Sequence, residues 1–139
     1  MHRLASTLGY RGMEVMCIGR RFAAGGSVQI ENCRVKRMRL LFNKGPFFYA
    51  CFNLRLFLYL LFAPRPSLLI ANDLDTLLAS YLASRIRRSA LIYDSHEYFT
   101  EVPELINRRA TRKFWLRLEG FLLRRIRFAI TVSEPIARK

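Results

Sequence analysis

The chain has 139 residues, which suits a single domain, and its 52% hydrophobic content excludes a disordered protein. Lysine and arginine number 24 against 10 acids, so the net charge of +14 favours an anionic partner: a membrane surface, a nucleic acid or a phosphorylated substrate. The cysteines Cys17, Cys33 and Cys51 form no C-x-x-C pair and indicate reduced thiols in a cytosolic protein. With only two histidines, a zinc site is not expected.

The expected order along the chain is one helix, two strands and then helices that alternate with strands. Leu4 and Leu8 have helical spacing, and the apolar runs that follow are short enough for buried strands. Helices are expected over residues 2–10, 47–63, 75–88 and 108–127 and again after Pro135, and strands over 14–19, 33–41, 67–71, 90–93 and 128–132. Strands that alternate with helices indicate βαβ crossovers, so the sequence predicts an α/β fold with a parallel sheet.

Residues 47–63 (FFYACFNLRLFLYLLFA) are the one transmembrane candidate of the sequence. The segment is slightly short for a bilayer, and Arg55 near its middle would cost about 2.5 kcal/mol or more in the hydrocarbon. We therefore interpret it as a buried or interfacial helix, with a spanning helix as the alternative. Residues 1–21 lack the continuous apolar run of a signal peptide.

Polar residues follow two of the expected strands at the end where parallel sheets bind their ligands. Asn72 and Asp73 come after residues 67–71, and Asp94, His96 and Glu97 come after residues 90–93. A histidine beside carboxylates can have its tautomer fixed and its pKa raised, which suits proton transfer or a hydrogen bond to a hydroxyl. The alternative is a loop histidine that ties the strand end to the next helix.

The spacing of Asp73 and Asp75 also allows a metal-binding pair. Asp75 is better explained as the N-cap of a helix that begins at Thr76, so we expect capping or substrate contact and no metal. The sequence has no G-x-G-x-x-G and no Walker loop, so no cofactor is expected. No serine stands in a nucleophile elbow.

The expected helix over residues 108–127 carries eight basic residues and one acid, Glu119. Trp115, Leu118 and Leu122 give it an apolar stripe. It is either a surface helix packed on the sheet with solvated arginines, or a patch that binds the surface of an anionic membrane.

Residues 67–104, followed by Trp115, Glu119 and residues 130–134, resemble family 4 glycosyltransferases. The most specific parts are residues 72–77 (NDLDTL) and 93–98 (YDSHEY), and residues 2–15 are similar to the first helix and second strand of the family's N-terminal domain. The resemblance covers nearly the whole chain. It implies the GT-B fold, in which two Rossmann-like domains face each other across a cleft.

The implied activity is transfer of a sugar from a nucleotide-sugar donor to an acceptor hydroxyl, with retention of configuration and without a metal. In this family the N-terminal domain mainly holds the acceptor, and the donor is bound mainly by the C-terminal domain. The resemblance makes His96 the catalytic candidate and assigns substrate binding to Asn72, Asp73, Asp94 and Glu97. The expected setting is synthesis of a cell-surface glycan or glycolipid in the cytoplasm, with peripheral attachment to the inner membrane face as an option.

The family begins with a strand and a glycine loop that precede the helix matched by residues 2–10. That strand lies mid-sheet, so we expect two strands on one side of it and three on the other. We accordingly expect a single incomplete Rossmann-like domain over residues 1–139, a fragment that is inactive alone. The alternative is a basic, non-catalytic module that binds membranes or nucleic acid. Nucleic acid is not expected, because the aromatic residues fall mostly in apolar helices.

Overall fold

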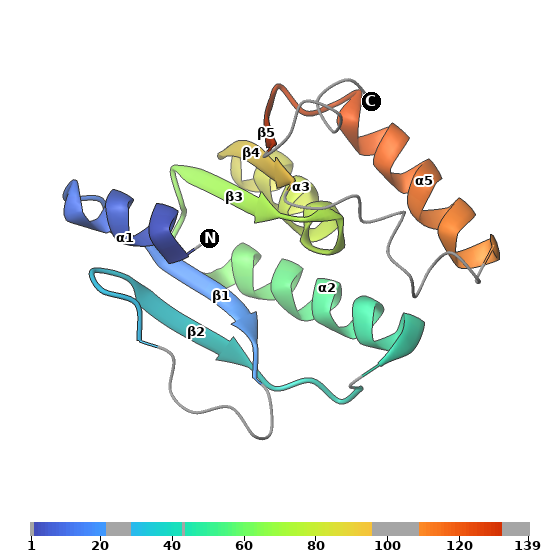
Figure 1. Ribbon diagram of the computed structural model, residues 1–139, viewed down its shortest axis with the longest axis horizontal. Coiled ribbons are helices and arrows are strands. Elements are labelled where there is room, and N and C mark those ends of the chain that lie inside the picture. The colour runs from blue at the N-terminus through green and yellow to red at the C-terminus, as the bar shows by residue number, and fades with distance from the viewer. Residues whose placement is uncertain (1, 22–28, 43, 96–108, 132–139) are drawn as a thin grey trace. The chain divides into compact units, whose positions relative to one another are not determined.

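The computed structural model describes residues 2–21, 29–42, 44–95 and 109–131 (Figure 1). The chain divides into two compact units, Met1–Arg55 and Leu56–Lys139, and each is described by itself. All strand pairs in both units are parallel among the described residues, which confirms the predicted parallel pairing.

The first unit contains helix α1 and a two-stranded parallel sheet. Helix α1 spans His2–Tyr10, strand β1 spans Met16–Arg20 and strand β2 spans Arg34–Met38. Cys17 pairs with Val35 in the register of this sheet. The predicted helix is confirmed with its bounds, and both predicted strands are present but shorter than expected.

Gly9 fixes how α1 approaches the turn before β2. A Cβ atom at Gly9 would lie 2.1 Å from the carbonyl oxygen of Asn32, which is closer than two non-bonded atoms can approach. Asn32 itself has a positive φ of 55°. Only glycine therefore allows this contact between helix and turn.

Helix α2 spans Gly45–Phe62 and confirms the helix predicted for the aromatic segment. Its buried side chains recur every fourth residue and form one stripe: Phe48, Phe52, Leu56 and Leu60. The opposite side is exposed and also apolar, including Phe47, Leu54, Leu58 and Phe62. Among the described residues, α2 is the one helix long and apolar enough to cross a membrane, and 22% of it is buried.

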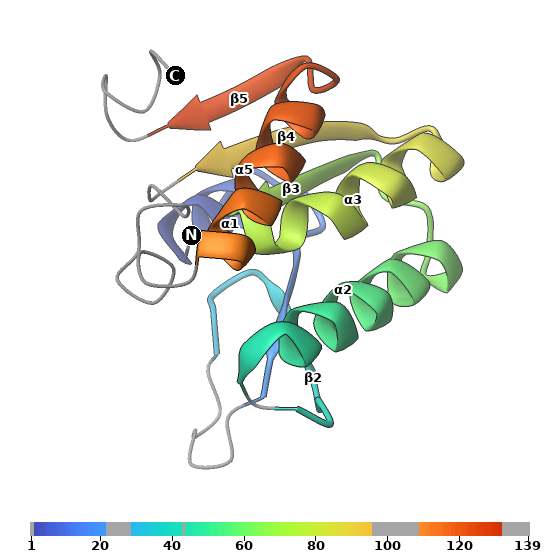
Figure 2. The ribbon, with the colours of Figure 1, turned by 90° about the vertical axis from the view of Figure 1, so that its right-hand side faces the viewer.

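The second unit contains a three-stranded parallel sheet and the helices α3 and α5. Strand β3 spans Leu68–Asn72, α3 Leu74–Arg87, β4 Ala90–Ser95, α5 Arg109–Leu123 and β5 Phe128–Thr131. The strand order is β3-β4-β5, and α3 packs on β3 and β4 and against α5 (Figure 2). The core contains Ala71, Leu74, Leu77, Ala83 and Leu122, each at most 1% exposed.

The strand ladders therefore form groups of two and three, as the sequence predicts. No described ladder joins β1 to β3. The helix expected after Pro135 lies outside the described residues.

The guanidinium of Arg87 connects the end of α3 to the end of α2. Its Nη1 donates to the carbonyl oxygen of Leu61 at 2.5 Å, and its Nη2 donates to that of Ala63 at 2.8 Å. These carbonyls lie at the C-terminus of α2, where the helix leaves acceptors without intrahelical donors and where a cation is favoured. Next to it, the Ser89 hydroxyl donates to the Pro66 carbonyl at 2.6 Å.

Replacing Arg87 by alanine should lower the free energy of unfolding by about 2–3 kcal/mol, because two charge-assisted hydrogen bonds are lost. Arg85 lies in the same helical turn and is exposed, so Arg85→Ala serves as the control and should change stability by less than about 0.5 kcal/mol. Urea unfolding followed by circular dichroism measures both. Equal effects of the two substitutions would contradict a capping role for Arg87.

Candidate functional site

The polar ends of β3 and β4 meet because the two strands are parallel and in register. Asn72 pairs with Asp94, and the backbone N–H of Asp73 donates to the carbonyl oxygen of Asp94 at 3.0 Å. Asp94 and Ser95 are only 4% and 6% exposed. The sheet therefore brings together three of the predicted site residues, Asn72, Asp73 and Asp94, as their places at strand ends predict.

Helix α3 starts directly at this edge, and its first residue is Leu74. The prediction that Asp75 is the N-cap is wrong, because Asp73 occupies the N-cap position and its side chain makes no capping hydrogen bond. The hydroxyl of Thr76 turns back and donates to the Asn72 carbonyl at 2.6 Å. Asp75 instead lies in the first turn, where the helix dipole favours a carboxylate.

The backbone of Asp73 is strained. Its φ of 62° and ψ of 165° lie in a region that is almost restricted to glycine. The hydrogen bond to the Asp94 carbonyl and the start of α3 on the other side hold the residue in this conformation. Such conformations cost about 1–3 kcal/mol and concentrate at functional sites. A carboxylate is therefore present at a position where glycine would be the relaxed choice.

Comparing Asp73→Gly with Asp73→Ala isolates this strain, because both substitutions remove the carboxylate and only glycine relaxes the backbone. We expect the glycine variant to be more stable than the alanine variant by about 1 kcal/mol. Denaturant unfolding of the two proteins provides the measurement. An alanine variant as stable as the glycine variant would show that the backbone is unstrained.

Tyr93 precedes Asp94 in β4, and the pKa of its hydroxyl responds to the charges of nearby acids. The side chain is 3% exposed, and burial raises the pKa of its hydroxyl above the ordinary value of 10.0. A hydrogen bond with Ser95 lowers that pKa, whereas the carboxylates of Glu119, Asp73 and Asp75 raise it. Acidic side chains from the N-cap and first turn of α3 and from α5 thus act on one buried hydroxyl.

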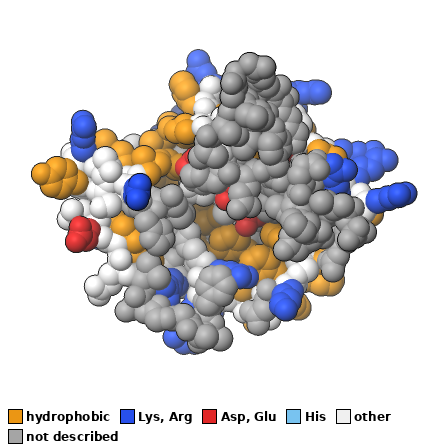
Figure 3. Space-filling model, viewed as in Figure 1, with side chains coloured by type: hydrophobic (Ala, Val, Ile, Leu, Met, Phe, Trp, Pro, Cys, Tyr) orange, Lys and Arg blue, Asp and Glu red, His pale blue; other side chains and the backbone are white. Residues whose placement is uncertain are grey.

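Glu119 was not among the predicted site residues, although the sequence offered a signal for it. It is the one acid in the basic helix, and its charge acts on the same Tyr93 hydroxyl as the charges of Asp73 and Asp75. In the space-filling view, a few acidic side chains lie together near the middle of the drawn face (Figure 3). We name Asn72, Asp73, Asp75, Asp94 and Glu119 the acidic edge.

His96 and Glu97 lie outside the described residues, so their predicted roles stay predictions. Within the described part of the chain, no group of three or more histidine, cysteine or acidic side chains could hold a metal ion. The chemistry available at the acidic edge is acceptance of hydrogen bonds from hydroxyl groups by carboxylate oxygens.

A family model described as a glycosyl transferase 4-like domain matches residues 1–139, the whole length of the chain. Comparison with curated proteins and with solved structures finds no match.

Proposed function

The chain belongs to the glycosyl transferase 4-like domain family, and we propose that its acidic edge binds the acceptor hydroxyl in sugar transfer from a nucleotide-sugar donor. The carrying observation is the hydrogen bond from the Asp73 N–H to the Asp94 carbonyl, which joins the polar ends of β3 and β4. This is the edge at which parallel α/β sheets bind ligands.

The acidic edge suits a sugar acceptor better than an anionic one. Carboxylates accept hydrogen bonds from sugar hydroxyls but repel phosphate, although the chain as a whole carries a net charge of +14. In this proposal the diphosphate of the donor is bound by a second domain that faces the acidic edge. Asn72, Asp73, Asp94 and Glu97 bind substrate, and the acceptor is a glycan or a glycolipid.

The proposed chemistry is transfer with retention and without a metal. Positive charge develops on the donor sugar as its bond to the diphosphate breaks, so the transition state has oxocarbenium character. His96 follows β4 in the sequence by one residue, and we assign it a hydrogen bond to the donor sugar that strengthens as this charge develops. This role rests on the resemblance of residues 93–98 to the family.

The test uses an enzyme in which this domain is joined to its donor-binding domain. His96→Ala should lower the turnover number by about 10²–10⁴, because a positioned hydrogen-bonding or acid–base group is lost. His2→Ala, at the other histidine, is the matched control and should leave turnover unchanged. Release of the nucleoside diphosphate from a panel of nucleotide-sugars gives the rate, and NMR of the product gives the anomeric configuration.

Near-normal turnover of the His96→Ala enzyme would contradict the proposed hydrogen bond of His96 to the donor sugar. An inverted anomeric configuration in the product would overturn the retaining mechanism. The chain of residues 1–139 alone should release no nucleoside diphosphate, because in this proposal the donor diphosphate is bound elsewhere.

A specific observation on α5 favours attachment to a membrane surface. Trp115 and Leu122 are buried, so this part of the apolar stripe packs inside the unit. Phe114 and Phe121 are 58% and 48% exposed, and they lie two helical turns apart on one side of α5. The guanidinium of Arg125 lies 3.6 Å from the centre of the Phe121 ring. Exposed aromatic rings beside cations suit the interface of an anionic bilayer.

We expect the protein to co-sediment with vesicles that contain anionic lipid and to dissociate as salt is added. Changing Lys113 and Arg117 to glutamine should weaken this binding about tenfold or more, since each cation near the surface is worth about 1 kcal/mol. Changing the exposed Arg3 and Arg85 to glutamine removes the same charge from other helices and is the control. Equal binding to neutral and anionic vesicles would leave α5 as a solvated helix.

A further inference from the structure

The thiols of Cys17 and Cys33 are in direct contact in the first unit. The Cys33 thiol donates a hydrogen bond to the Sγ atom of Cys17, and the two sulfur atoms are 3.2 Å apart. The glycosyltransferase site proposed above uses neither residue. A contact between two thiols therefore requires a separate explanation.

The fold brings these residues together from positions 16 residues apart. Cys17 lies in β1 and pairs with Val35 of β2. Cys33 precedes Val35 by two residues, so its side chain is on the same side of the strand as that of Val35. A turn positions Cys33, whose N–H donates to the Ile30 carbonyl at 3.2 Å.

We propose that Cys17 and Cys33 are a redox-active pair that a peroxide oxidises to an intramolecular disulfide. A disulfide has an S–S distance of about 2.05 Å, so the sulfur atoms must approach by roughly 1.2 Å. Rotation of the two side chains about their Cα–Cβ bonds supplies a movement of this size. The strand register of β1 and β2 is kept.

The surroundings indicate which thiol reacts first. Cys33 is partly exposed and lines a surface hollow with Gln29, Ile30, Glu31 and Val35, which offers a small oxidant a route to this residue. Burial, the hydrogen bond with Cys33 and the charge of Cys33 raise the pKa of Cys17 to about 12. Cys17 is therefore protonated at neutral pH, and the thiolate is the form that attacks a peroxide.

The step balances with hydrogen peroxide as the oxidant. The Cys33 sulfur attacks one peroxide oxygen, the O–O bond breaks, and a sulfenic acid and one water form. The Cys17 sulfur then attacks the Cys33 sulfur, the S–O bond breaks, and hydroxide leaves as a second water with the proton of Cys17. Two thiols and one peroxide give one disulfide and two waters.

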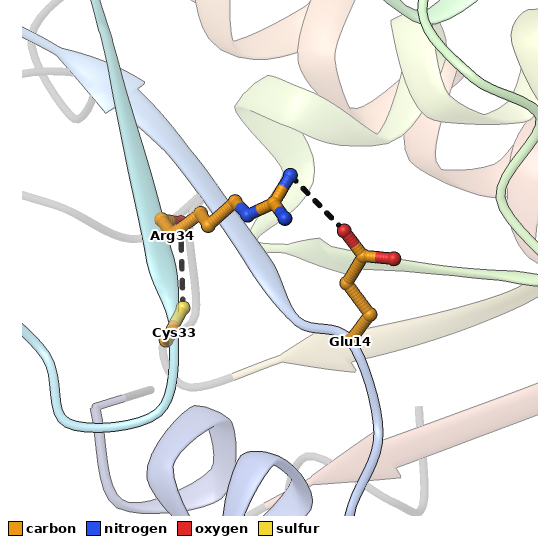
Figure 4. Close-up of polar contacts among 3 residues, drawn as sticks. All are labelled: Glu14, Cys33 and Arg34. Carbon is orange, nitrogen blue, oxygen red and sulfur yellow. Dashed lines mark hydrogen bonds and ion pairs between the residues drawn. The ribbon is translucent and has the colours of Figure 1, made fainter.

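The neighbouring ion pair does not block this reaction. The guanidinium Nη1 of Arg34 lies 3.1 Å from the carboxylate of Glu14, and its side chain extends away from the Cys33 thiol (Figure 4). Of the Arg34 atoms, only the backbone carbonyl oxygen is near the thiol, and it lies 3.4 Å from the Sγ atom of Cys33. Cys33 is therefore free to rotate toward Cys17 without breaking the ion pair.

The disulfide would tie β1 to β2 and close the chain between them into a covalent loop. A covalent tie restrains unfolding of this unit, because the unfolded chain loses conformational freedom. In a reducing cytosol the pair stays reduced, and it closes only under oxidative conditions. The structure thus assigns a redox-sensitive link to the first unit.

The experiment treats the folded chain of 139 residues with hydrogen peroxide, blocks remaining thiols with an alkylating reagent and maps the tryptic peptides. Each cysteine lies on its own tryptic peptide: Cys17 in residues 12–20, Cys33 in residues 22–34 and Cys51 in residues 45–55. We expect the first two peptides to be linked and Cys51 to be alkylated. Cys51→Ser is the control that keeps the link, and Cys17→Ser and Cys33→Ser abolish it.

Repeating the reaction in urea separates the folded geometry from mere proximity in sequence. Cys33 is 16 residues from Cys17 and 18 from Cys51, so an unfolded chain closes the two loops with nearly equal ease. The ratio of the Cys17–Cys33 link to the Cys33–Cys51 link should be near one in urea and about tenfold or more higher in the folded protein. An unchanged ratio, or links between chains instead of within one chain, would overturn the proposal.

Discussion

Parallel pairing of β3 with β4 is the constraint on which the rest of the second unit depends. The pairing sets Asn72 opposite Asp94, and its last hydrogen bond runs from the Asp73 N–H to the Asp94 carbonyl. A shift of one residue in this register would turn every side chain of the strand to the other face. It would also separate the polar residues at the strand ends.

This pairing is maintained at the opposite end of the strands by polar contacts to the backbone. Ser89 and Arg65 bind the carbonyls of Pro66 and Arg88, and Arg87 binds the end of α2. One end of the sheet is thus tied by hydrogen bonds to carbonyl groups, and the other end carries the acidic edge. The strained backbone conformation is at Asp73, the N-cap residue of α3. The buried side chains of Leu74 and Leu77 hold the first turn of that helix in the core.

The charge distribution follows from the same arrangement. In a chain of net charge +14, acids from the N-cap and first turn of α3 and from α5 act on the buried hydroxyl of Tyr93. Arg125, two residues after α5, lies over the exposed ring of Phe121. A single helix can therefore supply Glu119 to the acidic edge and present cations to an anionic surface, because neighbouring residues of a helix point in different directions.

Much of the fold and part of the candidate site could be predicted from the sequence, for reasons that are local. Apolar runs and their spacing predicted the helices and strands, since period and composition are properties of short segments. The alternation of those elements predicted parallel pairing, and the positions of Asn72, Asp73 and Asp94 after strands predicted that they would meet. The resemblance of the sequence to family 4 glycosyltransferases agrees with the family model that matches the whole chain.

Only the tertiary structure decided the features that depend on residues distant in sequence. The N-cap fell on Asp73 instead of Asp75 because the backbone bond to Asp94 fixes where β3 ends and α3 begins. Glu119 joined the acidic edge because α5 packs against α3, and no local pattern specifies that packing. Cys17 and Cys33 look like separate thiols in the sequence and touch in the structure because strand register, unlike periodicity, is set by contacts between segments.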